Sequence, residues 1–195
     1  MRKTNTAETE VEKAAMIEIR IIDEAHKADI NIPNEPFALF GRIAVSFSDG
    51  SWTHRLIRFA PEEVGEMRFP DENYQYEAMT DSVFLGAYDG ERCVGLAILQ
   101  PGFFKYMYLY DLKVHRAWRR QHVGSLLLEH AKQLAAARGC CGLYTVGQDN
   151  NPGACLFYLN SGFVIGGLDT HVYRHTKQEG KADIIFYCEC EAEER

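Results

Sequence analysis

The segment 106–138 constrains the fold more than any other part of this chain; it reads YMYLYDLKVHRAWRRQHVGSLLLEHAKQLAAAR. Its opening, Tyr106–Val114, is rich in aromatic and β-branched residues and has the length of a strand. From Val123 onward leucines and alanines recur at helical spacing, and Gly139 supplies a stop signal. The segment therefore predicts a buried strand, a short basic loop and an amphipathic helix.

The junction between this strand and this helix is suited to bind an anion. A helix start collects unpaired backbone N–H groups and the positive end of the helix dipole. Two arginines lie beside it, and a glycine lets the backbone approach a ligand. We expect a pyrophosphate cradle here, with an ordinary basic helix start on a solvated surface as the alternative. Its residues are Arg119, Arg120, Gln121, His122, Val123, Gly124 and Ser125.

The composition is typical of a globular protein. The 195 residues fit one domain with a sizeable core, and 46% of them are hydrophobic. No apolar run approaches the roughly 18 residues that a membrane span needs, and the N-terminus lacks the apolar region of a signal peptide. A cytoplasmic location is therefore expected. The net charge of −7 argues against nucleic acid and favours a cationic ligand.

Cysteine and histidine spacing gives no sign of a metal site. The cysteines lie mostly inside apolar segments without zinc-ligand spacing, which predicts buried free thiols; they are Cys93, Cys140, Cys141, Cys155, Cys188 and Cys190. The histidines that could tempt a metal or catalytic interpretation have no second ligand at metal spacing with carboxylate support; they are His115, His122, His130, His171 and His175. We therefore predict no bound metal.

The order of the other elements predicts a mixed α/β sheet with helices packed against it. Residues 1–15 are charged and small and are expected to form a flexible tail, followed by one domain over 16–195. Residues 60–80 are expected to form an irregular connection. Asn151 is placed to cap a second helix that ends at Ser161-Gly162. Further strands are expected at Ile17–Ile22, at Phe37–Phe47 and Trp52–Phe59 (a hairpin), and at Ser82–Tyr88, Cys93–Gln100, Gly142–Val146, Phe163–Ile165 and Asp183–Cys190.

Two motifs resemble the GNAT N-acetyltransferases. The acetyl-CoA signature of that family, V-x4-R-x-x-G-x-G/A, is matched here by Val114, Arg119 and Gly124. His122 departs from it, because the family usually has glycine there; we expect this histidine near the phosphates, where protonation would help to hold them. The segment 148–163 resembles a second signature, N-x-x-A-x-x-F/L-Y-x-x-x-G-F, of the same superfamily.

The resemblance implies the GNAT fold, a mixed and mostly antiparallel sheet that is splayed where acetyl-CoA binds. It implies that Asn151 contacts the pantetheine arm and that Tyr158 protonates the departing thiolate. A phenol is protonated at pH 7, which suits a general acid; the alternative is a half-buried packing residue. The expected acetyl-CoA contacts also include the junction residues given above and Leu112, Lys113 and Val114, with the Leu112 amide stabilising the oxyanion.

Further segments are similar to the streptothricin acetyltransferases: 34–37, 40–42, 110–114 and 166–170, with Tyr173. That similarity implies transfer of acetyl from acetyl-CoA to the β-lysine arm of an antibiotic, which inactivates it. Other acceptors remain open, including a polyamine, an aminoglycoside or a protein lysine. A non-catalytic acetyl-CoA-binding module is a third possibility. Dimers are common in the superfamily, so a homodimer is possible here by analogy.

Acidic residues are the candidates for holding a cationic amine. Asp111 is expected to bind the substrate ammonium or remove its proton, with Tyr110 lining the same cleft. The alternative for Asp111 is a structural carboxylate that pairs with Arg116. Asp169 and Glu35 are further candidates for substrate binding, and loop formation is the alternative for Asp169.

Overall fold

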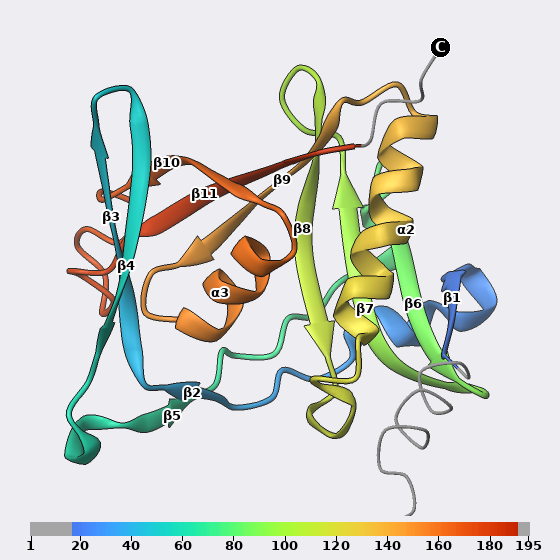
Figure 1. Ribbon diagram of the computed structural model, residues 1–195. Helices are drawn as coiled ribbons and strands as arrows, with labels where there is room; N and C mark the ends of the chain where they lie inside the picture. The colour runs from blue at the N-terminus through green and yellow to red at the C-terminus, as the bar shows by residue number, and fades with distance from the viewer. Residues whose placement is uncertain (1–16, 191–195) are drawn as a thin grey trace, which may run out of the picture.

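The computed structural model describes residues 17–190, which include a seven-stranded sheet of order β1-β6-β7-β8-β9-β11-β10 (Figure 1). Two ribbons of two strands, β2–β5 and β3–β4, lie beside it. All neighbours in the large sheet are antiparallel except β8 and β9, so the predicted mixed, mostly antiparallel sheet is confirmed. The strands are β1 (Ile17–Ile21), β2 (Phe37–Leu39), β3 (Gly41–Ser48), β4 (Ser51–Arg58), β5 (Gly65–Met67), β6 (Val83–Asp89), β7 (Arg92–Gln100), β8 (Tyr106–Val114), β9 (Gly142–Gln148), β10 (Val164–Asp169) and β11 (Asp183–Glu189).

Two α-helices in the described part of the chain pack against one face of this sheet. Helix α2 (Val123–Ala137) contacts β1 and β6 to β9, and α3 (Pro152–Asn160) contacts β2, β3 and β9 (Figure 1). Helix α3 begins as predicted, with Asn151 as its N-cap. Short 3-10 helices cover Glu24–Asn31, Pro61–Glu63, Tyr76–Ala78 and Arg116–Trp118.

The core consists of two apolar clusters, one on each face of the sheet. The larger one joins α2 and α3 to the strands, and Leu127, Tyr158 and Phe186 belong to it. The smaller one packs Ile30 of the 3-10 helix 24–31 against Leu96 and Ile98 of β7. Both faces of β6 and β7 are thus covered, which is why these strands read as continuous apolar runs.

The large sheet opens between β8 and β9. These parallel strands pair only over Tyr106–Tyr108 and Gly142–Tyr144, and beyond that they separate (Figure 1). On its other side β8 carries a bulge, since Leu109 pairs with Leu99 and Asp111 with Ile98, leaving Tyr110 as the extra residue. The expected splay of the sheet is therefore present.

Two strand assignments from the sequence were wrong in extent. Phe37–Leu39 does not belong to the β3–β4 hairpin but pairs with Gly65–Met67, inside the connection expected to be irregular. β10 runs on from Ile165 through two glycines to Asp169. A Cβ on Gly166 would lie 2.4 Å from the Tyr187 ring, so glycine is needed for close strand packing rather than as a breaker.

The cysteine prediction was correct in part. The six cysteines are free, but only Cys155 and Cys188 are buried, and Cys141 is exposed. Cys141 lies in the bend before β9, where the apolar run that suggested burial meets solvent. The flexible tail expected at residues 1–15 lies outside the described residues.

Candidate active site

The start of α2 has an unusual backbone. His122, its N-cap, has φ 61° and ψ 3°, and its side chain makes no capping hydrogen bond. Arg120 also has φ 61°. This left-handed conformation strains most residues, though histidine is among those that adopt it more often, and glycine adopts it freely. The backbone at His122 therefore has the geometry for which the family motif usually supplies glycine.

Gly124 allows α2 to approach α3. A Cβ at this position would lie 3.0 Å from Cζ of Phe157, tighter than nine in ten real Cβ contacts. The backbone N–H groups of Val123, Gly124 and Ser125 precede the first helical hydrogen bond, which Leu126 N–H donates to the His122 carbonyl. These N–H groups can donate hydrogen bonds to anionic oxygen atoms, as the expected pyrophosphate cradle requires.

The two arginines of the cradle differ in their surroundings. Arg119 donates from Nε to the Val114 carbonyl at 3.0 Å and from a terminal nitrogen to the Pro36 carbonyl at 2.9 Å. Its guanidinium therefore ties the end of β8 to the loop before β2, and its positive charge stays beside the start of α2. Arg120 is exposed and makes no side-chain hydrogen bond or ion pair within the described residues, so its charge is available to a ligand. Gln121 donates to the Ala117 carbonyl at 2.7 Å.

Tyr158 points from α3 to the place where β8 and β9 separate. It is 8% exposed, and the rings of Phe163 and Phe186 lie 5.3 and 5.6 Å away. A side-chain hydrogen bond links it to Thr145, whose hydroxyl donates to the Leu109 carbonyl at 2.9 Å. Burial raises the pKa of Tyr158 above that of a free phenol, so the hydroxyl holds its proton at neutral pH. The Tyr158 ring therefore packs in the core, and its protonated hydroxyl remains a candidate proton donor.

Asp111 lies in a polar network on the sheet face opposite α2. Leu112 and Val114 pack into the larger core cluster, so the bulge turns Asp111 to the other side. Tyr74 donates its hydroxyl to Asp111 Oδ2 at 2.9 Å, and Lys113 Nζ lies 3.2 Å from the same atom. The expected alternative partner, Arg116, pairs instead with Glu66 at 3.4 Å.

Electrostatics connect the two catalytic candidates. Burial raises the pKa of Asp111, and the Lys113 charge and the Tyr74 hydrogen bond oppose that rise. The charge of Asp111 in turn adds to the burial that raises the pKa of Tyr158. Asp111 and Tyr158 make no direct hydrogen bond within the described residues, and the charge of Asp111 acts on the Tyr158 hydroxyl from the other face of the sheet. Lys113, 10% exposed and bound also to Glu72 at 2.5 Å, is available to a cofactor mainly through its backbone.

Three tyrosines that the sequence interpretation missed, Tyr74, Tyr108 and Tyr144, lie around Tyr110, which it did name. The Tyr74 ring lies 6.0 Å from that of the exposed Tyr110, and Tyr110 lies 5.7 Å from Tyr108. Tyr108 in turn stacks on Tyr144 of β9 at 4.6 Å. The alternation of tyrosines along β8 was the available signal, because side chains two apart in a strand share a face. Nothing in the sequence linked Tyr74 to Asp111.

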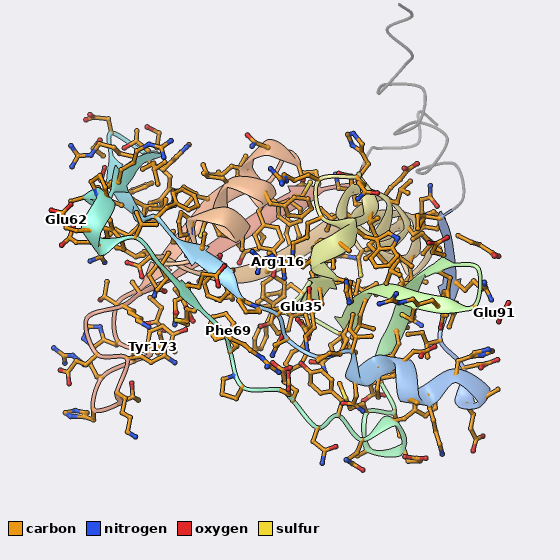
Figure 2. The ribbon with its side chains drawn as sticks, turned by 90° about the horizontal axis from the view of Figure 1, so that it is seen from below. Glu35, Glu62, Phe69, Glu91, Arg116 and Tyr173 are labelled. Atoms are coloured by element: carbon orange, nitrogen blue, oxygen red, sulfur yellow. The ribbon has the colours of Figure 1, made fainter. Side chains whose placement is uncertain are left out.

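The other acidic candidates have local partners. Glu35, in the loop before β2, accepts a hydrogen bond from the Arg116 backbone and lies 3.5 Å from His115 and 3.8 Å from Arg119, so it is bound to the loop before α2 (Figure 2). Asp169 Oδ1 accepts from the backbone N–H groups of His171 at 2.7 Å and Val172 at 3.1 Å, as a turn-forming residue does. Neither makes a contact with Asp111 within residues 17–190.

Asn151, the expected pantetheine contact, also caps helix α3. Its Oδ1 accepts the Ala154 N–H at 3.2 Å.

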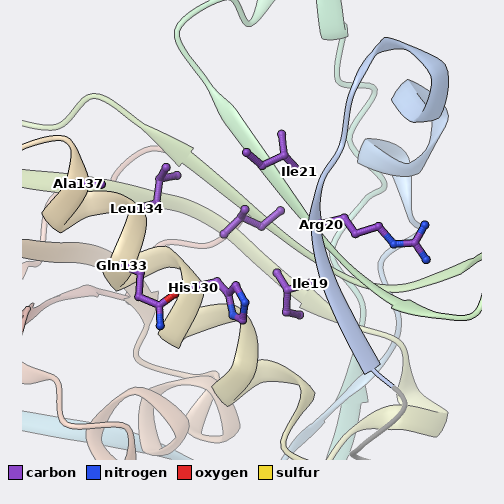
Figure 3. Close-up of a pocket in the computed structure, with 8 residues that line it drawn as sticks. Ile19, Arg20, Ile21, His130, Gln133, Leu134 and Ala137 are labelled. Carbon is purple, nitrogen blue, oxygen red and sulfur yellow. The ribbon is translucent and has the colours of Figure 1, made fainter.

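A hollow of about 310 Å³ between β1 and α2 is a separate feature, lined by Ile19, Ile21, His130 and Leu134 among others (Figure 3). None of the expected site residues lines it.

Within residues 17–190 no group of three or more His, Cys, Asp or Glu side chains is arranged to hold a metal ion. None of the helices described there is long and apolar enough to cross a membrane.

Comparison with known proteins agrees with this geometry. Residues 51–163 match the model of the acetyltransferase (GNAT) family. The chain is 31% identical to streptothricin acetyltransferase A of Bacillus subtilis (strain 168) over 159 residues, which are 82% of this chain and 92% of that one. The crystal structure of a nourseothricin acetyltransferase is 23% identical, covers 90% of this chain and 99% of its own, and has a TM-score of 0.74. A structure of a proposed streptothricin acetyltransferase from Bacillus anthracis str. Ames, in complex with acetyl coenzyme A, is 23% identical, covers 89% and 99%, and has a TM-score of 0.78.

The splayed sheet and the open start of α2, together with the family match over residues 51–163, are those of an acyl-transferring enzyme of the GNAT type. The chain belongs to the GNAT acetyltransferase family. It is an N-acetyltransferase, and its cosubstrate is acetyl-CoA, which the backbone at the start of α2 and the opening beside β8 fit.

Proposed function

We propose that this enzyme acetylates a primary amine of a cationic antibiotic, the β-lysine moiety of streptothricin, and so confers resistance. The observation that carries this proposal is the similarity to streptothricin acetyltransferase A over 82% of the chain. The net charge of −7 supports a cationic acceptor. We also propose that the enzyme acts in the cytoplasm, where its cosubstrate is available.

In the proposed mechanism Asp111 binds the acceptor ammonium and receives its proton, directly or through water. Tyr74 and Lys113 hold the carboxylate in place. The neutral amine then attacks the acetyl carbonyl, and the backbone N–H of Leu112, beside the bulge, stabilises the negative charge on oxygen. Tyr158 gives its proton to the sulfur as the thioester bond breaks, and the proton that remains on the attacking nitrogen restores the phenol, directly or through water. The support for this last role is its burial, which keeps the hydroxyl protonated.

Binding of acetyl-CoA is assigned to the start of α2 and to the last residues of β8. The N–H groups at Val123–Ser125, with Arg119 and Arg120 beside them, would receive the pyrophosphate. The main chain at Val114 would pair with the pantetheine arm as an added strand does. Asn151 would contact the same arm while capping α3.

The test is a thiol-release assay with purified enzyme, acetyl-CoA and a panel of acceptors. The panel contains streptothricin, a polyamine, an aminoglycoside and a lysine peptide, and mass spectrometry confirms each product. We expect streptothricin to give the highest kcat/KM. A better acceptor elsewhere in the panel would reassign the substrate, and acetyl-CoA binding without thiol release from any acceptor would favour a non-catalytic module.

A further inference from the structure

Asp183 lies on the same face of the sheet as Asp111. It is the first residue of β11 and pairs with Gln148 of β9. Its neighbours along the strand, Ile184 and Phe186, are buried in the cluster under α2 and α3. Because side chains alternate along a strand, Asp183 faces the opposite side, where the tyrosines of β8 lie.

The Asp183 carboxylate has no cationic partner in the described part of the chain. Its Oδ1 accepts a hydrogen bond from the Tyr173 hydroxyl at 2.7 Å (Tyr173 is labelled in Figure 2), and Oδ2 accepts none from residues 17–190. Asp149, in contrast, is paired with Arg42, and Asp111 lies 3.2 Å from Lys113. A partly buried carboxylate without a counter-charge is costly, and burial raises the pKa of Asp183.

Tyr108 is on β8, the strand that carries Asp111, and its buried neighbours Met107 and Leu109 face α2, so its ring lies on the same sheet face as the two carboxylates. Burial raises its pKa, and the neighbouring tyrosines and the charges of Asp183 and Asp111 add to that rise. Its partly buried ring stacks on Tyr144 with an interplanar angle of 12°. Aromatic faces of this kind attract cations. A carboxylate at each end and tyrosine rings between them form a surface suited to an extended molecule with more than one positive charge.

The sheet order sets the scale of that surface. Asp111 is on β8 and Asp183 on β11, and β9 lies between them. Two interstrand spacings amount to about 10 Å, and the opening between β8 and β9 adds to this. A second cation that reaches Asp183 must therefore be several bonds away from the amine held at Asp111.

We infer that Asp183 is a specificity-determining residue that binds a second positive charge of the acceptor, away from the amine that is acetylated. The preferred acceptors are then amines with at least two cationic groups separated by an extended spacer. Tyr173 positions the Asp183 carboxylate, and Tyr108 lines the path between the two charges. This inference rests on the proposed acetyltransferase function at the Asp111 end of the surface.

The experiment compares acceptors that differ in the second charge alone. A series of α,ω-diamines of increasing length is assayed against monoamines of matching length, by thiol release with saturating acetyl-CoA. Asp183→Asn is the test variant, since asparagine keeps the size and can still accept the Tyr173 hydrogen bond. Asp49→Asn is the control, because it removes the same charge from the exposed β3–β4 turn.

For the wild type we expect kcat/KM to favour the diamines that are long enough to span the surface. Asp183→Asn should lower kcat/KM for these by about tenfold or more, mainly through KM, as loss of a charge-assisted contact does. Values for monoamines and the KM for acetyl-CoA should stay within about twofold, and added salt should weaken the wild-type preference. Asp49→Asn should behave as the wild type.

Three results would overturn the inference. One is equal loss by Asp183→Asn on monoamines and diamines, which would indicate a general structural role. Another is unchanged diamine kinetics in a folded Asp183→Asn protein, with folding checked by its thermal unfolding curve. The third is a wild type that acetylates monoamines and diamines equally well. A wild type that acetylates no amine at all would instead reject the proposed function, and the inference with it.

Discussion

The left-handed backbone at His122 can be tested by comparing His122→Gly with His122→Ala. The φ of 61° and ψ of 3° cost a residue with a Cβ about 1–2 kcal/mol. Glycine avoids this cost but loses about 0.4–1 kcal/mol more through the entropy of its unfolded chain. His122→Gly should therefore be as stable as the wild type or up to about 1.6 kcal/mol more stable, from the difference of these two terms.

The alanine variant makes the test decisive, because left-handed and right-handed conformations at residue 122 predict opposite orders of stability for the two variants. At a left-handed position the glycine variant should be more stable than the alanine variant by about 1 kcal/mol. In a right-handed helical conformation the alanine variant would be more stable by a similar amount. The exposed His122 side chain makes no capping hydrogen bond, so few lost contacts complicate the comparison.

Urea unfolding with equal m-values measures this difference, and thermal unfolding should show His122→Gly about 2–4 °C above His122→Ala. An alanine variant as stable as the glycine variant would refute the left-handed start of α2. Calorimetry with acetyl-CoA adds a functional readout: we expect His122→Gly to bind as well as the wild type or better. A loss of more than tenfold would show that the imidazole itself holds the phosphates.

Four further predictions concern the site. Tyr158→Phe should lower kcat far more than acetyl-CoA affinity, and a kcat equal to the wild type would remove this hydroxyl from the mechanism. Arg119→Ala should weaken acetyl-CoA binding by about 1–3 kcal/mol in calorimetry, and unchanged binding would limit the arginine to its structural contacts. Since Asp111 must be ionised to take a proton and burial raises its pKa, kcat/KM should fall as the pH drops through a value above the usual pKa of about 3.9; Asp111→Asn should be slow and lack this limb, and a wild-type profile flat down to pH 4 would contradict the role. Gly124→Val should destabilise the protein by about 1–3 kcal/mol in urea unfolding because its Cβ would overlap Phe157, and wild-type stability would show that α2 and α3 separate easily.

Local signals in the sequence were sufficient for the elements around the site. The Asn151-Pro152 start of α3 and the Gly139 end of α2 were predicted correctly, since capping depends on residues close in the chain. The strand over Tyr106–Val114 was also correct, because its composition and length fit no other element. The two motifs, which contain the start of α2 and Tyr158, then indicated the GNAT fold.

Contacts between residues that are distant in the sequence could not be predicted from local sequence patterns. No pattern in Gly65–Met67 indicates a strand, because its order comes from pairing with Phe37–Leu39. The bulge at Tyr110, which turns Asp111 toward Tyr74, depends on the register with β7 and leaves no mark in composition. The inward contacts of Arg119 could not be foreseen for the same reason, since its acceptor at Pro36 lies far away in the chain.

The short pairing of β8 with β9 divides the sheet into two blocks. One contains β1, β6, β7 and β8, and the other contains β9, β11 and β10. Only three residue pairs join their backbones, so the blocks meet as at a hinge, and packing under α2 and α3 supplies the rest of the connection. A molecule that hydrogen-bonds along the free edge of β8 would bridge them, so cosubstrate binding would stiffen the whole sheet and fix the distance between Asp111 on β8 and Asp183 on β11, the two carboxylates proposed to bind the acceptor.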